Sequence, residues 1–298
     1  MKTLDIIVPV YNEEDCLEEM FSRLNRVKNS LVGIVDVSFL FVNDGSKDKS
    51  EEILRGFAQN NPYVKVVNFV RNFGHQIAVT AGINLTDADY AVIIDADLQD
   101  PPELIIDMYN KAQEGFDIVY GKRLKREKET AFKKITAFGF YRVLDFLCNL
   151  NIPKDTGDFR LITRNVTDVL KNMPEHNRFI RGMVPWTGFK SAPIEFDREE
   201  RFAGETHYPL KAMFKLAANA IFSFSTKPLK MINYLACVLV VCALYSLIRL
   251  NMISATILFC TALQLFATGI VGAYIGRIYE EALARPLYII KDKYNIGE

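Results

Sequence analysis

The sequence predicts an α/β fold in which a mostly parallel sheet is covered by helices and is followed by membrane-associated segments. Three observations lead to this prediction. Strand-like and helix-like patterns alternate through the first 120 residues, which is typical of parallel strands joined by helices. Polar residues stand directly after several of the apolar runs. Beyond about Arg201 the composition changes, and two long uncharged segments follow.

The expected strands and helices alternate in order along this first part. The apolar run Leu4–Val10 is expected to form a strand, and Glu13–Val27 has the spacing of an amphipathic helix. The further elements expected are strands at Val35–Val42, Val64–Val70, Tyr90–Ile94 and Asp117–Tyr120, and helices from Ser46 to Phe57, from about Gln76 and from Pro101. Proline suits the first turn of a helix, which supports the last of these starts.

The segment 92–103 ends an apolar strand in two carboxylates, Asp95 and Asp97. Their spacing along an extended chain places both on the same side. Adjacent carboxylates repel unless a cation lies between them, and Mg²⁺ or Mn²⁺ binds a few carboxylates together with substrate phosphates. The pattern therefore indicates a metal-bound diphosphate of a nucleotide-activated substrate. For such a pair taken alone, a solvated loop between a strand and a helix is the alternative.

Other polar residues follow the first two expected strands. Ligands of such sheets bind beyond the carboxyl ends of the strands, so Tyr11, Glu13 and Asp44 are expected at the same rim as the two aspartates. Tyr11 suits stacking on a base, and Asp44 suits accepting from an imide or ribose group. Plain packing of Tyr11 and an ordinary turn at residues 44–46 are the alternatives. Neither GxGxxG nor GxxxxGK[ST] occurs in these places, which argues against a dinucleotide enzyme and a P-loop NTPase.

Composition narrows the class of protein further. The formal net charge is zero, so no nucleic-acid partner is expected. The five cysteines show no metal or disulfide spacing, which fits a reducing compartment. The three histidines lie far apart in sequence and form no zinc pattern. Asp5 interrupts the first apolar run, so the N-terminal residues do not resemble a signal peptide.

Two segments without charge, 231–248 and 250–276, are each long enough to cross a bilayer core, which takes about 20 residues. The short turn around Arg249 separates them. We expect a two-helix transmembrane hairpin with helices at residues 229–250 and 253–276. A buried helical pair in a soluble protein is the alternative.

Lysines and arginines flank this hairpin outside its turn. The positive-inside rule then places an N-terminal catalytic domain, residues 1–207, and a tail, residues 277–298, in the cytoplasm, as in a multi-pass protein of the cytoplasmic inner membrane. Two spans per chain favour a homo-oligomer. Residues 208–228 are expected to form an amphipathic juxtamembrane helix on the bilayer surface; a helix packed against the core is the alternative.

Four motifs resemble one family. They are Pro9–Glu13, Asn43–Ser46, Asp95–Glu103 and Thr156–Arg160. Together they closely resemble the family 2 glycosyltransferases of the GT-A fold, whose sheet is Rossmann-like. More narrowly, the chain resembles the polyprenyl-phosphate sugar transferases, which include dolichyl-phosphate mannose synthase and bactoprenol glucosyltransferases of the GtrB type. The resemblance covers nearly the whole chain, and its motifs are specific for the subfamily but not for the sugar.

The resemblance implies roles for the donor-side residues. The nucleotide would be held by Pro9, Tyr11, Glu13, Asp44 and Asp95. Asp95, Asp97 and Gln99 would surround the cofactor, Mg²⁺ or Mn²⁺, and the diphosphate. Arg201 would clamp the donor phosphates. His207 stands where many relatives have lysine, which leaves its role open.

On the acceptor side, the resemblance makes Asp158 catalytic together with Asp97 and assigns the lipid phosphate to Arg123. Asp158 matches the carboxylate usually assigned as the base. A phosphate monoester is already mostly dianionic at neutral pH, so Asp158 orients the acceptor or a cation in a second interpretation, and caps a turn in a third. The charged run 122–129 is expected to be a mobile acceptor loop or a solvated charge run.

The implied reaction is an inverting transfer of one sugar from a nucleotide sugar to polyprenyl phosphate. UDP and glucose lead by resemblance to the bacterial branch; mannose, an amino sugar and 4-amino-4-deoxyarabinose stay open. Trp186 is not part of a Gln-x-x-Arg-Trp motif, which favours one sugar per turnover. The other classes considered are a membrane-anchored nucleotide-sugar binding protein and a flippase-type protein, and the uncharged spans argue against the latter.

Overall fold

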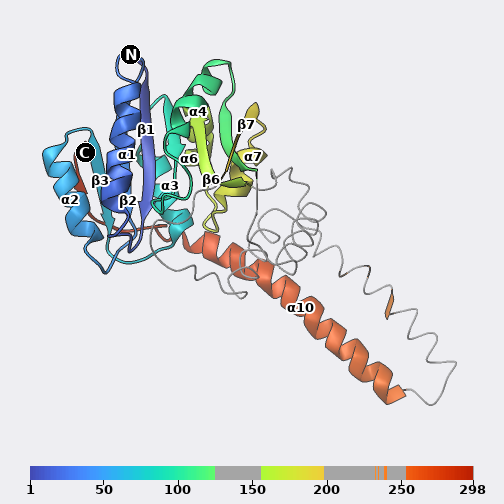
Figure 1. Ribbon diagram of the computed structural model, residues 1–298. Coiled ribbons are helices and arrows are strands. Elements are labelled where there is room, and N and C mark those ends of the chain that lie inside the picture. Colours follow the sequence, from blue (N-terminus) through green and yellow to red (C-terminus); the bar gives the residue numbers. More distant parts are fainter. Residues whose placement is uncertain (125–155, 198–231, 233, 235–237, 240–252, 298) are drawn as a thin grey trace. The chain divides into compact units, whose positions relative to one another are not determined.

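The computed structural model describes residues 1–124, 156–197, 232, 234, 238–239 and 253–297 (Figure 1). The described residues fall into two compact units, one of which contains residues 1–124, 156–197 and 286–297. The other contains helix α10, Ile253–Leu283. The expected interfacial helix, Arg201, His207 and the charged run beyond Leu124 lie outside the described residues.

The first unit is built on one eight-stranded sheet, in the order β7-β5-β6-β4-β1-β2-β3-β8. Its strands are β1 Thr3–Val10, β2 Asp36–Asn43, β3 Val64–Phe69, β4 Tyr90–Ile93, β5 Ile118–Arg123, β6 Thr156–Thr163, β7 Ser191–Phe196 and β8 Ile290–Tyr294. Its helices are α1 Leu17–Ser30, α2 Ser50–Asn60, α3 His75–Leu85, α4 Leu104–Gln113, α6 Arg164–Asn172 and α7 Ile180–Trp186.

The four strands expected first, β1 to β4, run parallel to one another, as predicted. The rest of the sheet is mixed. Strand β6 runs antiparallel to both β4 and β5, β7 runs parallel to β5, and β8 runs antiparallel to β3. The α/β class and the mostly parallel sheet are therefore confirmed, because strands β1 to β5 and β7 all run in one direction and, among the described strands, β6 and β8 run in the other. Strands β6, β7 and β8 were not expected from the sequence.

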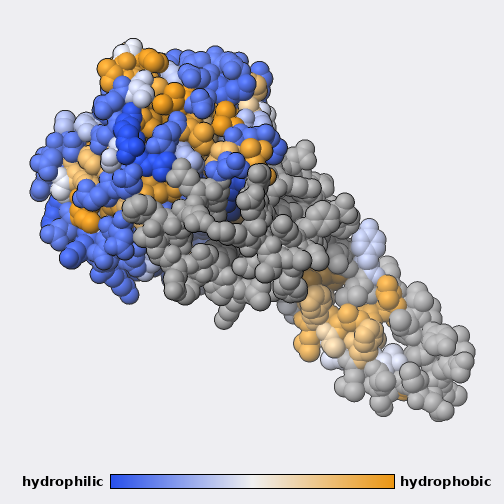
Figure 2. Space-filling view, in the orientation of Figure 1, coloured by the Kyte–Doolittle hydropathy of each residue, from blue (hydrophilic) through white to orange (hydrophobic). Residues whose placement is uncertain are grey.

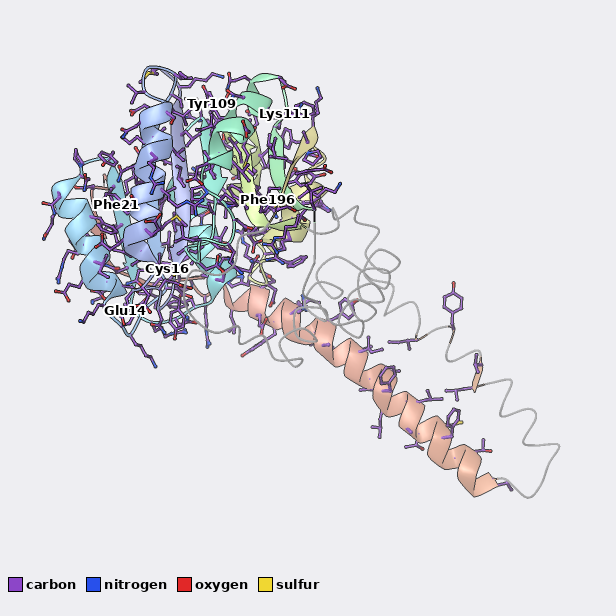
Figure 3. All side chains as sticks on the ribbon, in the orientation of Figure 1. Glu14, Cys16, Phe21, Tyr109, Lys111 and Phe196 are labelled. Carbon is purple, nitrogen blue, oxygen red and sulfur yellow. The ribbon has the colours of Figure 1, made fainter. Side chains whose placement is uncertain are left out.

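Helices cover both faces of this sheet because β1 and β2 are apolar at nearly every position and must be buried on both sides. On one face, Phe21 of α1, labelled in Figure 3, stacks on Phe57 of α2, with ring centroids 4.2 Å apart. On the other face, α3 lies so close to β1 that a Cβ added at Gly82 would be 2.2 Å from a methyl carbon of Ile7. Glycine at this position thus permits the close packing of helix and strand.

Element boundaries differ from the expectation mainly at helix starts. Helix α1 begins at Leu17 rather than at Glu13, because the Glu13 carbonyl closes a turn with the amides of Cys16 and Leu17. Helix α4 begins at Leu104, three residues after Pro101. Loops at these carboxyl ends of strands therefore take residues that helical periodicity alone had assigned to helices.

The C-terminal residues 290–294 are a strand rather than part of a featureless tail. Strand β8 pairs with the edge of β3, with Asn68 opposite Asp292 and Val67 opposite Lys293. A five-residue segment with two exposed lysines has little strand signal of its own, since its stability comes from a partner distant in sequence.

Helix α10 is 31 residues long, and its portion Phe259–Leu283 is long and apolar enough to cross a membrane. Its apolar side chains, including Leu265 and Phe266, are largely exposed (Figure 2). The helix extends seven residues beyond the expected span 253–276. Only four residues of the other expected span, 229–250, are described, so the predicted hairpin is not confirmed.

Candidate functional site

The rim of the sheet at the carboxyl ends of β1 to β4 brings together three polar side chains. His75 begins α3, Asp95 follows β4, and Asp158 stands near the start of β6. Ile93 pairs with Arg160 across the antiparallel β4–β6 ladder, and two residues beyond this pair the chain places Asp95 opposite Asp158. The ligating atoms of the three residues all lie within 4.8 Å of one another.

Asp158 is buried and is held by cationic and amide side chains. Arg181 of α7 donates from Nε to Asp158 Oδ1 at 2.9 Å and from Nη2 to Oδ2 at 2.8 Å. His75 Nε2 lies 3.2 Å from Oδ2, and Gln76 Nε2 lies 3.5 Å from the same oxygen. Burial alone would raise the pKa of Asp158, but Arg181 and His75 outweigh it and hold this pKa well below its usual range.

Asp95 is in the opposite electrostatic situation. Burial raises its pKa, and the neighbouring carboxylates of Asp158 and Asp97 add to the effect, while His75 opposes it. Its Oδ1 atom is buried and accepts no hydrogen bond, although His75 Nε2 lies 3.5 Å away in an ion pair. Burial by itself would lower the pKa of His75, but Asp95 and Asp158 raise it to about 9. A buried carboxylate oxygen that accepts no hydrogen bond, beside a second carboxylate, suits a divalent cation.

Asp97 is buried and lies two residues after Asp95 in sequence. It is not one of the three members of the cluster. Its Oδ1 accepts from the Gln99 amide at 3.2 Å, which closes a tight turn. Leu98 within the turn takes the left-handed backbone conformation, with φ 59°. This conformation is costly for a branched residue and occurs mainly where a ligand site or turn requires it. Of the two expected carboxylate ligands, the structure thus brings only Asp95 into the cluster.

The loops after β1 and β2 contact each other through backbone and side-chain groups. The Asn12 amide donates to Ser46 Oγ at 3.0 Å, and the Lys47 amide donates to Asn12 Oδ1 at 2.8 Å. Pro9 lies inside β1, and Tyr11 is 41% exposed beside these loops. The Glu13 amide donates to Ser50 Oγ at 3.1 Å. The expected nucleotide residues of β1 therefore stand at one end of the sheet, where Figure 3 labels the nearby Glu14 and Cys16.

Asp44 is buried and organises the chain that leads to His75. Its two carboxylate oxygens accept from the amides of Phe73 at 2.6 Å and Gly74 at 2.8 Å. Burial raises the pKa of Asp44, and these two amides oppose the shift. The adjacent Gly45 has φ 66°, and a Cβ there would lie 2.4 Å from the Arg71 carbonyl carbon. Only glycine allows the two loops to approach this closely.

Arg123 ends β5 and forms an ion pair with the buried Asp100, at 3.2 Å from Nη2 to Oδ1. A Cβ added at Gly157 would lie 2.7 Å from Arg123 Nη2. Glycine thus leaves room for the guanidinium beside the strand that carries Asp158. The expected phosphate-binding arginine, Arg123, therefore lies at the end of β5, next to the start of β6 that carries Asp158, and it has a carboxylate partner in this structure.

Sequence reasoning missed His75, Gln76 and Arg181 as members of the site. The rule that ligands gather at carboxyl ends of strands was applied to the first, second and fourth strands. Applied to the third, it points to the segment 71–76, which carries two of the three. Arg181 follows no such strand, and no local signal marks it.

The family model and the relatives named below are all described as glycosyl transferases. The profile described as Glycosyl transferase family 2 matches residues 5–170. The chain is 47% identical to "Uncharacterized glycosyltransferase YkcC" of Bacillus subtilis (strain 168), over 98% of this chain and 94% of the relative. It is 36% identical to "Prophage bactoprenol glucosyl transferase homolog" of Escherichia coli (strain K12), over 97% and 98%. It is 35% identical to "Bactoprenol glucosyl transferase" of Shigella phage SfX, over 97% and 99%.

A solved glucosyl-3-phosphoglycerate synthase from Mycobacterium tuberculosis, in complex with Mn²⁺, UDP-glucose and phosphoglyceric acid, aligns with a TM-score of 0.47. Its sequence identity is 20%, over 75% of this chain and 78% of that chain. This likeness is too distant to bear on the function.

Proposed function

Since the chain belongs to glycosyl transferase family 2 and is a glycosyltransferase, we propose that it transfers one glucose from UDP-glucose to a polyprenyl phosphate. Two relatives of nearly equal length are named as bactoprenol glucosyl transferases or homologues of one, which supports this choice of sugar and acceptor. Mannose, an amino sugar and 4-amino-4-deoxyarabinose are the other sugars that the donor panel below distinguishes.

The observation that carries the proposal is the cluster of His75, Asp95 and Asp158, in which the buried Asp95 Oδ1 accepts no hydrogen bond. In the proposed site Asp95, Asp97 and Gln99 hold Mg²⁺ or Mn²⁺, and Pro9, Tyr11, Glu13 and Asp44 line the nucleotide. The ion, when bound, neutralises negative charge on the leaving diphosphate. Arg201 is proposed for the same diphosphate, and Arg123 for the acceptor phosphate.

Arg123 reaches the acceptor phosphate in this proposal by exchanging its carboxylate partner. A dianionic phosphate competes with Asp100 for the guanidinium, because arginine binds phosphate through two parallel hydrogen bonds in a bidentate geometry. The acceptor is then placed beside Asp158 on the neighbouring strand β6. A single in-line displacement at the anomeric carbon inverts its configuration.

Asp158 acts as an orienting anion rather than as the base in this proposal. Both of its oxygens are already engaged by Arg181, and one of them also by His75. A carboxylate held in this way accepts a proton poorly, because the added proton would compete with a guanidinium. The acceptor phosphate needs little help, since its second pKa is near 6.

The membrane arrangement is supported by strand β8. It follows α10 in sequence, yet it lies in the same sheet as β1 to β4. A sheet cannot be divided by a bilayer, so the chain must cross the membrane an even number of times between residues 197 and 286. If α10 crosses once, the expected span at residues 229–250 supplies the second crossing. The catalytic unit and both termini then lie on one side, and the lysines and arginines that flank the expected hairpin favour the cytoplasmic side. A homo-oligomer is a further expectation.

The test uses the purified full-length protein in detergent with undecaprenyl phosphate and a panel of nucleotide sugars. The glycolipid is identified by mass, and its anomer by NMR. We expect glucosyl phosphoryl undecaprenol of inverted configuration from UDP-glucose, no product in EDTA, and recovery with Mg²⁺ or Mn²⁺. A retained anomer, or product formation that EDTA does not reduce, contradicts the proposed mechanism.

A further inference from the structure

The C-terminal strand β8 is joined to the loop after β2 by a line of side-chain hydrogen bonds. Asn68 Nδ2 of β3 donates to Asp292 Oδ1 at 2.5 Å. Asn43 Nδ2 donates to Asn68 Oδ1 at 2.9 Å, and the Ser46 amide donates to Asn43 Oδ1 at 3.1 Å. Both asparagines are 0% exposed. The proposed reaction uses none of these four residues directly, so the line needs another explanation.

The two ends of the line impose the same direction on it. The carboxylate of Asp292 can only accept, and the backbone amide of Ser46 can only donate. Each asparagine must therefore present its amide nitrogen toward β8 and its oxygen toward the loop. A buried polar network in which every group is satisfied is rigid, whereas a partly satisfied one is destabilised. This line is of the first kind only while Asp292 is present.

The line continues into the loops proposed to bind the nucleotide. Ser46 Oγ accepts from the Asn12 amide at 3.0 Å. Asn12 stands between Tyr11 and Glu13 and has φ 55°, a left-handed conformation that asparagine adopts more readily than most non-glycine residues. Besides its amide, its Oδ1 contacts the loop after β2, where it accepts from the Lys47 amide at 2.8 Å. The geometry of the two loops thus depends on Ser46, and through Asn43 and Asn68 on the C-terminal strand.

We infer that Asp292 is a positioning residue for the nucleotide donor. It fixes Asn68 and Asn43, and these hold the loop 43–46 against the loop that contains Asn12. Removing the carboxylate leaves the Asn68 amide buried without its acceptor, and a side chain in that state turns or draws in water. This inference rests on the proposed function, because it takes these loops as the nucleotide site. Donor binding then depends on the strand that directly follows the apolar helix α10 in sequence.

The experiment measures steady-state kinetics of the full-length protein with UDP-glucose and undecaprenyl phosphate, each varied in turn. Asp292→Ala is expected to raise the KM for UDP-glucose about fivefold, the effect of about one hydrogen bond. The acceptor KM and kcat are expected to stay near wild type. Asp292→Asn keeps an oxygen that can accept from Asn68, so it is expected to restore the donor KM. Lys293→Ala changes an exposed side chain on the same strand and serves as the matched control.

A donor KM of Asp292→Ala equal to that of the wild type overturns the inference. A fall in kcat together with a rise in both KM values also overturns it, because that result indicates general destabilisation. So does a donor KM of Asp292→Asn that stays as high as that of Asp292→Ala. A wild type that uses no nucleotide sugar contradicts the proposed function instead. In that case calorimetric UDP affinities of the wild type and the three variants still decide the inference, with weaker binding expected for Asp292→Ala alone.

Discussion

At the scale of single residues, the site is defined by two neighbouring carboxylates, Asp95 and Asp158, whose pKa values are shifted in opposite directions. Arg181 and His75 stabilise the charge of Asp158, whereas burial disfavours the charge of Asp95. The first carboxylate is therefore neutralised by the protein itself. The second leaves an oxygen for a ligand from outside. This division of roles supports the proposal that Asp95 contacts the cation and that Asp158 orients the acceptor.

Asp158→Asn is predicted to lower kcat with UDP-glucose by about 100-fold, the effect expected when a reactant is misplaced by about 1 Å. Because Asp158 is expected to orient rather than to remove a proton, raising the pH should not restore the rate. Activity is measured across neutral and alkaline pH. The exposed Asp168→Asn on α6 is the control. Recovery of the Asp158→Asn rate at alkaline pH would show that proton removal is the main role.

His75 is predicted to make the metal-free protein less stable at alkaline pH. Its folded pKa is raised to about 9 from an ordinary value of 6.5, so its contribution is complete below 6.5 and is lost as the pH rises through about 9. The His75 side chain is 41% exposed, so solvent reduces the effect. Thermal unfolding in EDTA should show a gap between wild type and His75→Gln that narrows as pH rises. A gap that is constant or widens would contradict this assignment.

At the scale of elements, antiparallel strand β6 is what completes the site. Parallel strands β1 to β4 bring the residues that follow them to one rim. Strand β6 enters the same rim from its opposite end and thus supplies Asp158 at its beginning rather than after its end. Strand β8 acts at the other side of the sheet, where it covers the edge of β3.

Removal of residues 286–298 is predicted to destabilise the sheet and to promote self-association. The edge of β3 would lose its only antiparallel partner among the described strands, and an open edge pairs readily with other chains. Thermal unfolding and light scattering of the purified protein in detergent measure the two effects. A chain shortened only by its last two residues, beyond β8, is the control. Equal melting temperatures for the two truncations would contradict the prediction.

At the scale of the whole molecule, one chain combines a sheet unit whose polar surface faces water with a helix whose apolar surface is exposed. The burial of Leu265 and Phe266 in lipid would remove this surface from water, at about 25 cal/mol for each Å². The helix is followed after six residues by β8, so membrane and sheet are connected by a short stretch of chain.

Cysteine labelling is predicted to show that the segments before and after α10 lie on the same side of the membrane. The native cysteines are replaced, and single cysteines are introduced as Lys47→Cys and Gly297→Cys, both at exposed positions on either side of α10 in sequence. A membrane-impermeant thiol reagent should label both in inverted vesicles and neither in sealed spheroplasts. Labelling of the two cysteines from opposite sides would contradict an even number of crossings.

The sequence by itself determined the α/β class, the four parallel strands and the acidic pair after the fourth strand, because apolar runs and the polar residues that end them are local signals. Strand-end reasoning also located Tyr11, Glu13 and Asp44 at the rim. Only the tertiary structure decided that His75 and Arg181 join Asp158, and that residues 290–294 form a strand beside β3. Those contacts join residues far apart in the chain, and their stability comes from charge pairing and strand pairing that no local pattern records.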